Sequence, residues 1–434
     1  MEPTTVGYIG LVVLLLLMAS GVPIALCFAT VGFVGVLLMK GMGAAFGNLG
    51  VTPYMWASHY VLMAIPLFII MGYFAFHAGI SNDLYECAYK WIGHIPGGLA
   101  VATVITCAGL GATSGSSLAC SAAMGAVAIP EMEKHGYAKT LSTGCVAAGG
   151  TLGILIPPSI AMVIYGSICE ESISKLFIAG ILPGLVLTGA YCVAILIQVG
   201  FNPKLASPGP RFPLSERIRS LKGTWMMLAL FLLLMGGIFA GIFTPTEAAA
   251  VGAFGAFIFS VFRKRLNRKV MVNALEEAGR TTCMIFLLYI GAMMFMSFLA
   301  LTRLPYELSQ WVVSLPFPPI GIVAAIMIIY IPLGMFMDAL SMLILTLPIF
   351  YPIVVALGFD PIWFGILVVV VTELGLITPP VGLNVYILKG ATDLPLYGIF
   401  RGIIPFAIAD LVVLGILMVF PKISLLLPSL MTGK

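Results

Sequence analysis

The chain has 434 residues, of which 61% are hydrophobic and only 9% charged, and its mean hydropathy is +1.13. A soluble domain has roughly 25% charged residues, so this composition excludes a soluble protein and predicts an all-α polytopic membrane protein. The formal net charge of +4 comes mostly from two short basic clusters, which bear on membrane topology and give no support to nucleic-acid binding.

The cysteines and histidines do not form a pattern that indicates catalysis. The eight cysteines include no C-x-x-C pair and lie mostly in apolar runs, where a thiol behaves as a small hydrophobic group. The four histidines do not cluster with carboxylates or cysteines. We therefore expect no transition-metal site and no enzymatic activity.

Residues 1–80 are predicted to be N-terminal scaffold spans. Residues 6–39 are almost continuously apolar and contain Gly21-Val22-Pro23, so they form either one long kinked span or two short ones. No lysine or arginine precedes Lys40, which argues against a removable signal peptide, and we expect the first span to be retained. Residues 59–79 form a clearer span.

Residues 81–200 are predicted to contain an interfacial arm followed by membrane segments. Residues 81–94 mix charged and apolar side chains, as an amphipathic interfacial helix does. Residues 97–130 are apolar but interrupted by a Gly- and Ser-rich stretch, and each flank is too short to cross a bilayer. We therefore expect a re-entrant helical hairpin with its tip at Ser114–Ser117. A broken helix at 138–168 and a span at 176–200 follow.

Residues 201–277 are predicted to connect two halves of the protein. Two spans, at about 224–241 and 246–262, lie between basic stretches that contain Arg217, Arg219, Arg263, Lys264 and Arg265. Both basic loops are expected in the cytoplasm, because short cytoplasmic loops are enriched in lysine and arginine. Glu247 follows Thr244 at capping-box spacing, which indicates the start of a helix.

The second half repeats the first at a nearly constant spacing. Pro157-Pro158 and Pro379-Pro380 lie 222 positions apart, as do Gly153 and Gly375. The repeat predicts these second-half elements in residues 278–420: a span at 278–301, an arm at 304–315, a hairpin at 321–357, a broken helix at 362–390 and a span at 398–420. Residues 421–434 are expected to be a C-terminal tail. Repeats of this kind build many secondary carriers, usually with the two copies inverted in the membrane.

A Pro-Pro pair removes two backbone donors and breaks a helix. Within a bilayer, broken helices are tolerated where they are buried in protein or line a watery cavity, so two matched breaks predict a binding site. Hydroxyls at Thr113–Ser117 together with freed carbonyls at Gly153–Ile156 would form an oxygen cage for a hard cation. The alternative is that these small residues only allow close helix packing.

Three carboxylates fall within apolar segments, where a charge is costly and suggests function. Asp338 lies at the second hairpin tip, and it either has such a function or caps a helix. Glu373 precedes the second break and could orient the broken backbone or tune a cation site. Asp410, in the last span, and Arg303, at a span end, are either structural or functional.

Four motifs together resemble the large membrane (M) subunit of tripartite ATP-independent periplasmic (TRAP) transporters. They are the Ser114-Gly115-Ser116 tip, the segments 149–159 and 375–384, and Gly334-Met335-Phe336-Met337-Asp338. The resemblance covers essentially the whole chain. The family often continues the first tip with Gly-Pro-Ala-Thr, whereas this chain has Ser117-Leu118-Ala119-Cys120, so the local geometry of that tip is open.

The resemblance implies a multi-pass carrier of the bacterial inner membrane with an elevator mechanism and Na⁺ as coupling ion. It implies two partners, a small four-helix membrane subunit of Q type and a periplasmic substrate-binding protein of P type. By position, the first sodium site comprises Ser114, Ser116, Gly153, Ile156 and Pro158, and the second comprises Gly334, Gly375, Thr378 and Val381. Substrate-site candidates are Ser117, Thr151, Asp338 and Asn384.

We therefore expect sodium-coupled uptake of an organic anion, such as a C4-dicarboxylate or a sialic acid, that a periplasmic protein delivers. One alternative is a stand-alone sodium-dicarboxylate symporter of related hairpin architecture. A membrane enzyme or channel is a second alternative, but the sequence has no nucleophile-base or metal constellation for an enzyme.

Overall fold

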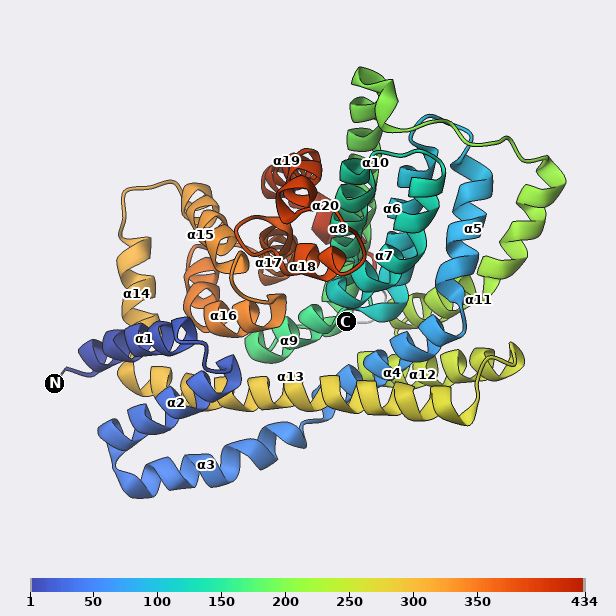
Figure 1. Cartoon of the computed structure of the whole chain (residues 1–434). Helices are drawn as coiled ribbons and strands as arrows, with labels where there is room; N and C mark the ends of the chain where they lie inside the picture. The colour runs from blue at the N-terminus through green and yellow to red at the C-terminus, as the bar shows by residue number, and fades with distance from the viewer. Residues whose placement is uncertain (1, 432–434) are drawn as a thin grey trace.

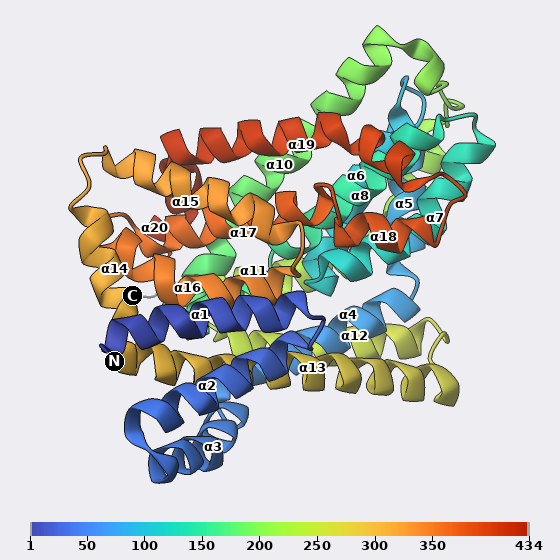
Figure 2. The ribbon, with the colours of Figure 1, turned by 60° about the vertical axis from the view of Figure 1, so that its left-hand side comes forward.

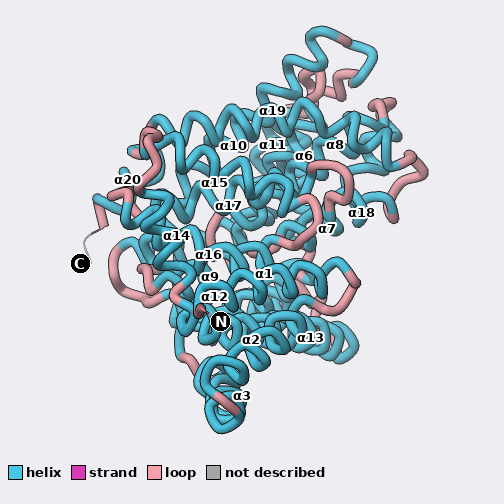
Figure 3. The backbone as a smooth tube through the Cα atoms, turned by 90° about the vertical axis from the view of Figure 1, so that its left-hand side faces the viewer, coloured by secondary structure: helices cyan, strands magenta, loops and turns pink. Residues whose placement is uncertain are grey.

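The computed structural model describes residues 2–431, and all the regular secondary structure in that range is helical. Within residues 2–431, seven helices are long and apolar enough to cross a membrane, or eight if one bent pair forms a single span. The helices form a layer of long, roughly parallel rods and a larger body packed on one face of that layer (Figure 2). Mostly short loops join the helices, as the tube in Figure 3 shows.

The layer contains the N-terminal helices and two helices from the middle of the chain. It comprises α1 (Pro3–Ala19), α2 (Ile24–Lys40), α3 (Met42–Ala57), α4 (Ala64–His77), α12 (Pro245–Phe262) and α13 (Arg268–Thr302). A short 3-10 turn, Tyr60–Met63, leads into α4. Helix α13 runs along the whole layer and packs against α2 and α4 (Figure 1).

The structure resolves the open choice for residues 6–39 in favour of two helices. Gly21 has a φ of +83°, a conformation that favours glycine, and Pro23 caps the start of α2. Helix α3 was not expected from the sequence, because its 16 residues include three glycines after Met42 and an internal Pro53. Its packing against α2 and α13 supports the helix despite this low propensity.

The layer packs at backbone distance, which glycine permits. A Cβ atom built on Gly32 of α2 would lie 2.6 Å from the backbone of Met294, and one on Gly291 of α13 would lie 2.4 Å from the carbonyl oxygen of Ala25. Small residues at helix crossings allow this close approach, which stabilises membrane helix pairs mainly by van der Waals contact.

The first half of the body follows the expected order of elements. It comprises the amphipathic arm α5 (Ile80–Ile92), the hairpin α6 (Gly98–Ser114) and α7 (Ser117–Lys134), the broken helix α8 (Lys139–Leu155) and α9 (Ile160–Cys169), and the long α10 (Ile173–Phe201). Helices α8 and α9 meet at an angle of 41°. The second helix of this hairpin, α7, extends to Lys134, four residues beyond the predicted end of the hairpin, because Pro130 is accommodated within it.

The connector contains α11 (Leu214–Phe239) and α12, preceded by a 3-10 turn, Pro203–Leu205. Thr244 and Glu247 form the predicted capping box at the start of α12. The guanidinium of Arg263 donates to the carbonyl oxygen of Gly223 at 3.1 Å, so the end of α12 lies beside the tenth residue of α11. The two basic clusters therefore lie at the same end of this helix pair.

The span predicted at 278–301 begins ten residues earlier than expected. Asn267 accepts a hydrogen bond from the backbone N–H of Val270 and caps the helix, so the polar residues 268–277 form the first turns of α13. The predicted boundary at 277 therefore falls inside a helix.

The second half comprises α14 (Leu304–Val313), the hairpin α15 (Pro319–Gly334) and α16 (Ala339–Ala356), the broken helix α17 (Pro361–Ile377) and α18 (Leu383–Lys389), and α19 (Leu396–Val419). A further helix, α20 (Lys422–Ser429), lies in the segment predicted as a tail, and it packs against α10 and α17. Residues 432–434 of that segment lie outside the described residues.

The two halves have the same order of helices: an arm, a hairpin, a helix broken at Pro-Pro and a long helix. The Pro157-Pro158 and Pro379-Pro380 peptide bonds are both cis. Helices α8 and α19, one from each half, cross at backbone distance, since a Cβ on Gly402 would lie 2.0 Å from the carbonyl oxygen of Thr140. The halves are thus packed into one body, and the inverted relation between them stays a prediction.

Candidate functional site

The tip of the first hairpin is a two-residue turn between α6 and α7. Gly115 has a φ of +59° and ends α6, and the Ser116 hydroxyl accepts a hydrogen bond from the Ala119 N–H at 3.4 Å to cap α7. The hydroxyl oxygen of Ser114 is buried and has no hydrogen-bond partner among the described residues. At this tip, the Ser116 hydroxyl oxygen therefore caps α7, while the Ser114 hydroxyl oxygen accepts no hydrogen bond from the described residues.

This tip packs directly on the first Pro-Pro break. A Cβ on Gly111 would lie 2.9 Å from the Cα of Gly153, and one on Gly153 would lie 2.8 Å from the carbonyl oxygen of Ser116. A Cβ on Gly115 would lie 3.0 Å from the carbonyl oxygen of Pro158. Any side chain at these three glycines would force the tip and the break apart.

The second tip meets the second break in the same way. A Cβ on Gly334 would lie 2.8 Å from the Cα of Gly375, and one on Gly375 would lie 2.5 Å from the Cα of Gly334. In both halves, the hairpin tip and the broken helix are in backbone contact, as the predicted ion cages require.

Asp338 caps the second tip. One carboxylate oxygen accepts the backbone N–H groups of Leu340 and Ser341, each at 3.1 Å, and the other accepts the Ser341 hydroxyl. The structure thus supports the capping alternative for this residue. Asp338 also lines a cavity, and a role for it in binding substrate stays a prediction.

The prolines leave carbonyl groups available at the first break. Pro157 and Pro158 have no N–H to donate to the carbonyls of Gly153 and Ile154, four residues earlier. The Ile156 side chain packs against Gly184 of α10, so its backbone carbonyl is the group it could offer to an ion.

At the second break, Thr378 uses both its N–H and its hydroxyl within the helix. The N–H bonds the carbonyl of Gly375 at 3.1 Å and the hydroxyl bonds that of Leu374 at 2.6 Å. The hydroxyl oxygen of Thr378 keeps lone pairs for a cation. Val381 lies in the non-helical link between the Pro-Pro pair and α18.

A cavity of about 960 Å³ lies between the two tips and the helical layer. Ser114, Ser116 and Asp338 line it from the tips, and α2, α4 and α13 line the opposite wall. Among its lining residues, Asp338 and Glu277 are charged and none is basic. Glu277 and Thr281 of α13 were not singled out from the sequence, because only the fold places that helix opposite the tips.

The other three substrate-site candidates lie beneath the cavity wall rather than in it. Ser117, Thr151 and Asn384 are fully buried, and none is among the residues that line the cavity. Asn384 of α18 donates to the Ser117 hydroxyl oxygen at 2.8 Å and lies 3.4 Å from the carbonyl oxygen of Ala147. These residues therefore join the two halves, and their direct contact with substrate stays a prediction.

A buried polar network lies next to them. Thr151 shares a hydrogen bond of 3.0 Å with the hydroxyl of Tyr191 on α10, which donates to both carboxylate oxygens of Asp410 on α19 at 2.8 Å. Asp410 is 0% exposed. The sequence indicated the carboxylate as a charge in an apolar span, but the partner, Tyr191, has no distinguishing local pattern.

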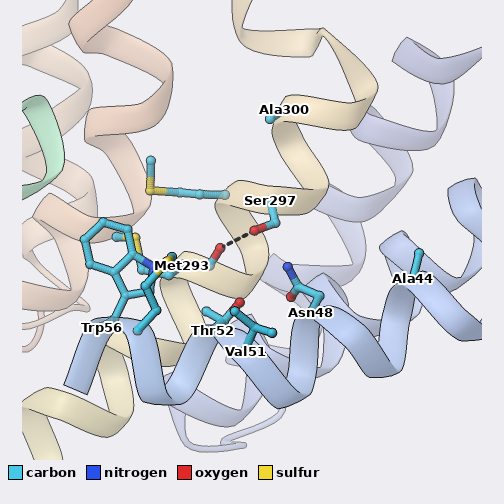
Figure 4. A pocket seen from close by; sticks show the side chains of 10 residues that line it. Ala44, Asn48, Val51, Thr52, Trp56, Met293, Ser297 and Ala300 are labelled. Carbon is cyan, nitrogen blue, oxygen red and sulfur yellow. Dashed lines mark hydrogen bonds between the residues drawn. The ribbon is translucent and has the colours of Figure 1, made fainter. Parts of the chain in front are cut away.

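A second cavity, of about 570 Å³, lies within the helical layer between α3 and α13. Figure 4 shows its walls, with Asn48 and Thr52 facing Ser297, whose hydroxyl bonds the carbonyl oxygen of Met293 at 2.9 Å. None of its lining residues belongs to a hairpin or a break. It is therefore a separate feature from the ion and substrate candidates.

Comparison with known proteins places this geometry among transporters. Residues 11–423 match the family described as "Tripartite ATP-independent periplasmic transporter, DctM component". The C4-dicarboxylate TRAP transporter large permease protein DctM of Pseudomonas aeruginosa is 39% identical over 383 residues, covering 88% of this chain and 89% of that protein. The sialic acid TRAP transporter large permease protein SiaM of Vibrio cholerae is 30% identical over 420 residues, covering 96% and 97%.

Among solved structures, the YdaH transporter of Alcanivorax borkumensis has a similar fold. The TM-score is 0.65 over 89% of this chain and 90% of that one, at 14% sequence identity. This likeness extends to the fold alone.

Proposed function

This chain belongs to the family of DctM components of tripartite ATP-independent periplasmic transporters, and from that premise we propose that it drives sodium-coupled uptake of an organic anion. The chain is the large permease of such a system, a multi-pass protein of the inner membrane and not an enzyme. It is a secondary transporter for organic acids that works with a substrate-binding protein, so the stand-alone symporter considered from the sequence is wrong.

The observation that carries the sodium proposal is the matched backbone contact between each hairpin tip and its Pro-Pro break. Gly111 meets Gly153 in the first half, and Gly334 meets Gly375 in the second. Each contact brings freed carbonyl oxygens next to the hydroxyl or carbonyl oxygens of a tip, and sodium, like other hard cations, prefers oxygen ligands. We propose one sodium ion at each contact.

The cavity between the tips and the helical layer is the proposed substrate site. An organic anion would meet the carboxylates of Asp338 and Glu277 there, and none of the described residues that line the cavity is a lysine or arginine. Sodium ions bound at the two tips would supply the positive charge that the lining lacks, so substrate and ions would bind together. C4-dicarboxylates and sialic acids are the proposed substrate classes, by analogy with the two relatives.

The separation into a layer and a body suits an elevator mechanism. The body, which contains both tips and both breaks, would move against the layer, with α5 and α14 as the linking arms. We also propose that a four-helix membrane subunit covers part of the layer, whose α1 and α3 expose many large apolar side chains.

Reconstitution tests the proposal. Proteoliposomes that contain the two membrane subunits, a sodium gradient and excess binding protein should take up the anion, and replacing sodium with potassium should abolish uptake. Omitting the binding protein should leave little uptake, because the cavity has no basic side chains with which to attract a free anion. Robust saturable uptake without that protein, or equal uptake in potassium, would contradict the proposal.

A further inference from the structure

A carboxylate without a partner lies in the core between the two halves. Glu373 of α17 is 0% exposed, and neither of its carboxylate oxygens has a hydrogen-bond partner among the described residues. None of the ion pairs in the part of the chain that the structure describes includes it. A buried charge is strongly unfavourable unless it is paired, so this group needs a counter-charge or a proton.

Two further buried oxygens without partners lie on α18 and α7, and α18 packs against both α17 and α7. The amide oxygen of Asn384 and the hydroxyl of Ser121 are also buried without partners. Asn384 reaches α7 through its bond to Ser117, and Ser121 lies one helical turn further along the same face. The Ser117 hydroxyl, the Asp410 carboxylate and the Cys120 thiol lie within interaction range of Glu373, although Ser117 does not meet hydrogen-bond geometry with it.

This cluster is distinct from the two tip contacts. Its members come from α7 of the first half and from α17 and α18 of the second, whereas each tip contact lies within one half. Glu373 takes the place that Thr151 has in the first repeat, and Thr151 is satisfied by Ala148 and Tyr191. The first half therefore has no equivalent buried charge at this position.

We propose that Glu373, Asn384, Ser117 and Ser121 bind a third monovalent cation, with sodium as the ion. Two carboxylate oxygens, an amide oxygen and hydroxyl oxygens form an all-oxygen ligand set with a single negative charge, which matches a monovalent hard cation. A proton on Glu373 would provide one donor and leave the other acceptors unpaired, whereas a cation is bound by all of them at once. Because the ligands come from both halves, the ion joins them.

Sodium-binding stoichiometry on the purified complex of the two membrane subunits tests this site. Radioactive sodium at saturating concentration should show one ion fewer per large subunit in Glu373→Gln than in the wild type. In Asn384→Ala and Ser121→Ala, the sodium affinity of one site should fall severalfold, while the other sites should bind sodium as in the wild type. Glu276→Gln, which removes an exposed carboxylate of α13, is the matched control and should bind as the wild type does.

Thermal stability gives a second measurement that does not require counting ions. Without sodium, in choline chloride, Glu373→Gln should melt at a higher temperature than the wild type, because the substitution removes an uncompensated buried charge. Saturating sodium should then raise the melting temperature of the wild type more than that of the variant, because a ligand that binds only the folded state stabilises it.

The outcomes separate this inference from the proposed function. Equal stoichiometry in the wild type and Glu373→Gln, with equal sodium-induced stabilisation, would overturn the third site and indicate a protonated carboxyl group, while two tip sites could still stand. An absence of sodium binding by the wild type would overturn both proposals. If Glu373→Gln cannot be purified, unchanged sodium affinity in both Asn384→Ala and Ser121→Ala would overturn the third site.

Discussion

The two Pro-Pro breaks share a sequence pattern but differ in their surroundings. Every residue from Thr151 to Ile160 is buried, so the first break is enclosed by the protein. At the second break, Pro379 and Pro380 are exposed and Thr378 is half-buried. The same helix-breaking chemistry therefore produces a closed break in one half and an open one in the other.

The difference comes from what packs on each break. Helix α10 covers the first, since a Cβ on Gly184 would lie 2.6 Å from the Ile156 side chain and one on Gly180 would lie 2.7 Å from the carbonyl oxygen of Leu155. The tips differ too, because Asp338 caps the second with a charged group and Ser116 caps the first with a single longer bond. A repeated motif thus does not imply equal access to water or ions.

The largest expected effect tests whether both tip contacts are needed. Gly153→Ala and Gly375→Ala should each lower uptake by about five- to 150-fold, because an overpacked contact costs about 1–3 kcal/mol and 1.4 kcal/mol corresponds to a factor of ten. The added methyl groups would meet backbone atoms at 2.8 Å and 2.5 Å. Uptake in proteoliposomes is the measurement. Gly189→Ala on α10 is the control, since nothing lies within 4 Å of its added Cβ. Normal uptake in one of the two variants would show that only the other contact matters.

Thiol labelling measures the difference in access between the breaks. Ser159→Cys and Val381→Cys occupy the same repeat position, but Ser159 is fully buried and Val381 is half-buried. In an otherwise Cys-free chain in detergent, the first cysteine should react at least about tenfold more slowly with a maleimide, which corresponds to a local opening free energy of about 1.4 kcal/mol. Equal rates would mean that the first break opens as readily as the second.

Sodium dependence compares the oxygen atoms at the two breaks. Thr378→Val removes a hydroxyl and keeps the side-chain shape, and Ser116→Ala, with Ser114→Ala beside it, is the test in the first half. Each loss of an ion ligand should raise the sodium concentration for half-maximal uptake by about two- to tenfold, because one ligand oxygen contributes about 0.5–1.5 kcal/mol to the free energy of sodium binding. The wild-type curve should be sigmoidal. A hyperbolic wild-type curve would remove the two-ion proposal and leave the breaks as packing devices.

The smallest expected effect compares the two caps. Asp338→Ala removes the acceptor of two backbone N–H groups and should cost about 1 kcal/mol of stability, or about 1–2 °C in melting temperature. Ser116→Ala should cost less, because its single bond is 3.4 Å long. Asp338→Asn should restore most of the loss in a thermal melt, since asparagine caps helices nearly as well as aspartate. A larger loss in Ser116→Ala than in Asp338→Ala would contradict this ranking.

The sequence alone determined the parts of this protein that depend on local chemistry. Proline pairs break helices wherever they occur, a capping box starts one, and apolar runs of sufficient length cross a membrane, so the hairpins, the breaks and the capping box at Glu247 could be predicted. Local signals did not predict α3 or α20, because glycines and prolines lower their intrinsic propensity and only packing stabilises them.

Tertiary structure decided which of the marked residues meet. The sequence indicated Asp410 as a costly charge, but only the crossing of α10 and α19 supplies Tyr191 as its partner. It suggested that Glu373 could tune a cation site, but its lack of a hydrogen-bond partner, and its nearness to Ser117 from another helix, depend on how the two halves pack. The physical reason is that burial and pairing belong to surfaces that come together only when distant segments of the chain fold against each other.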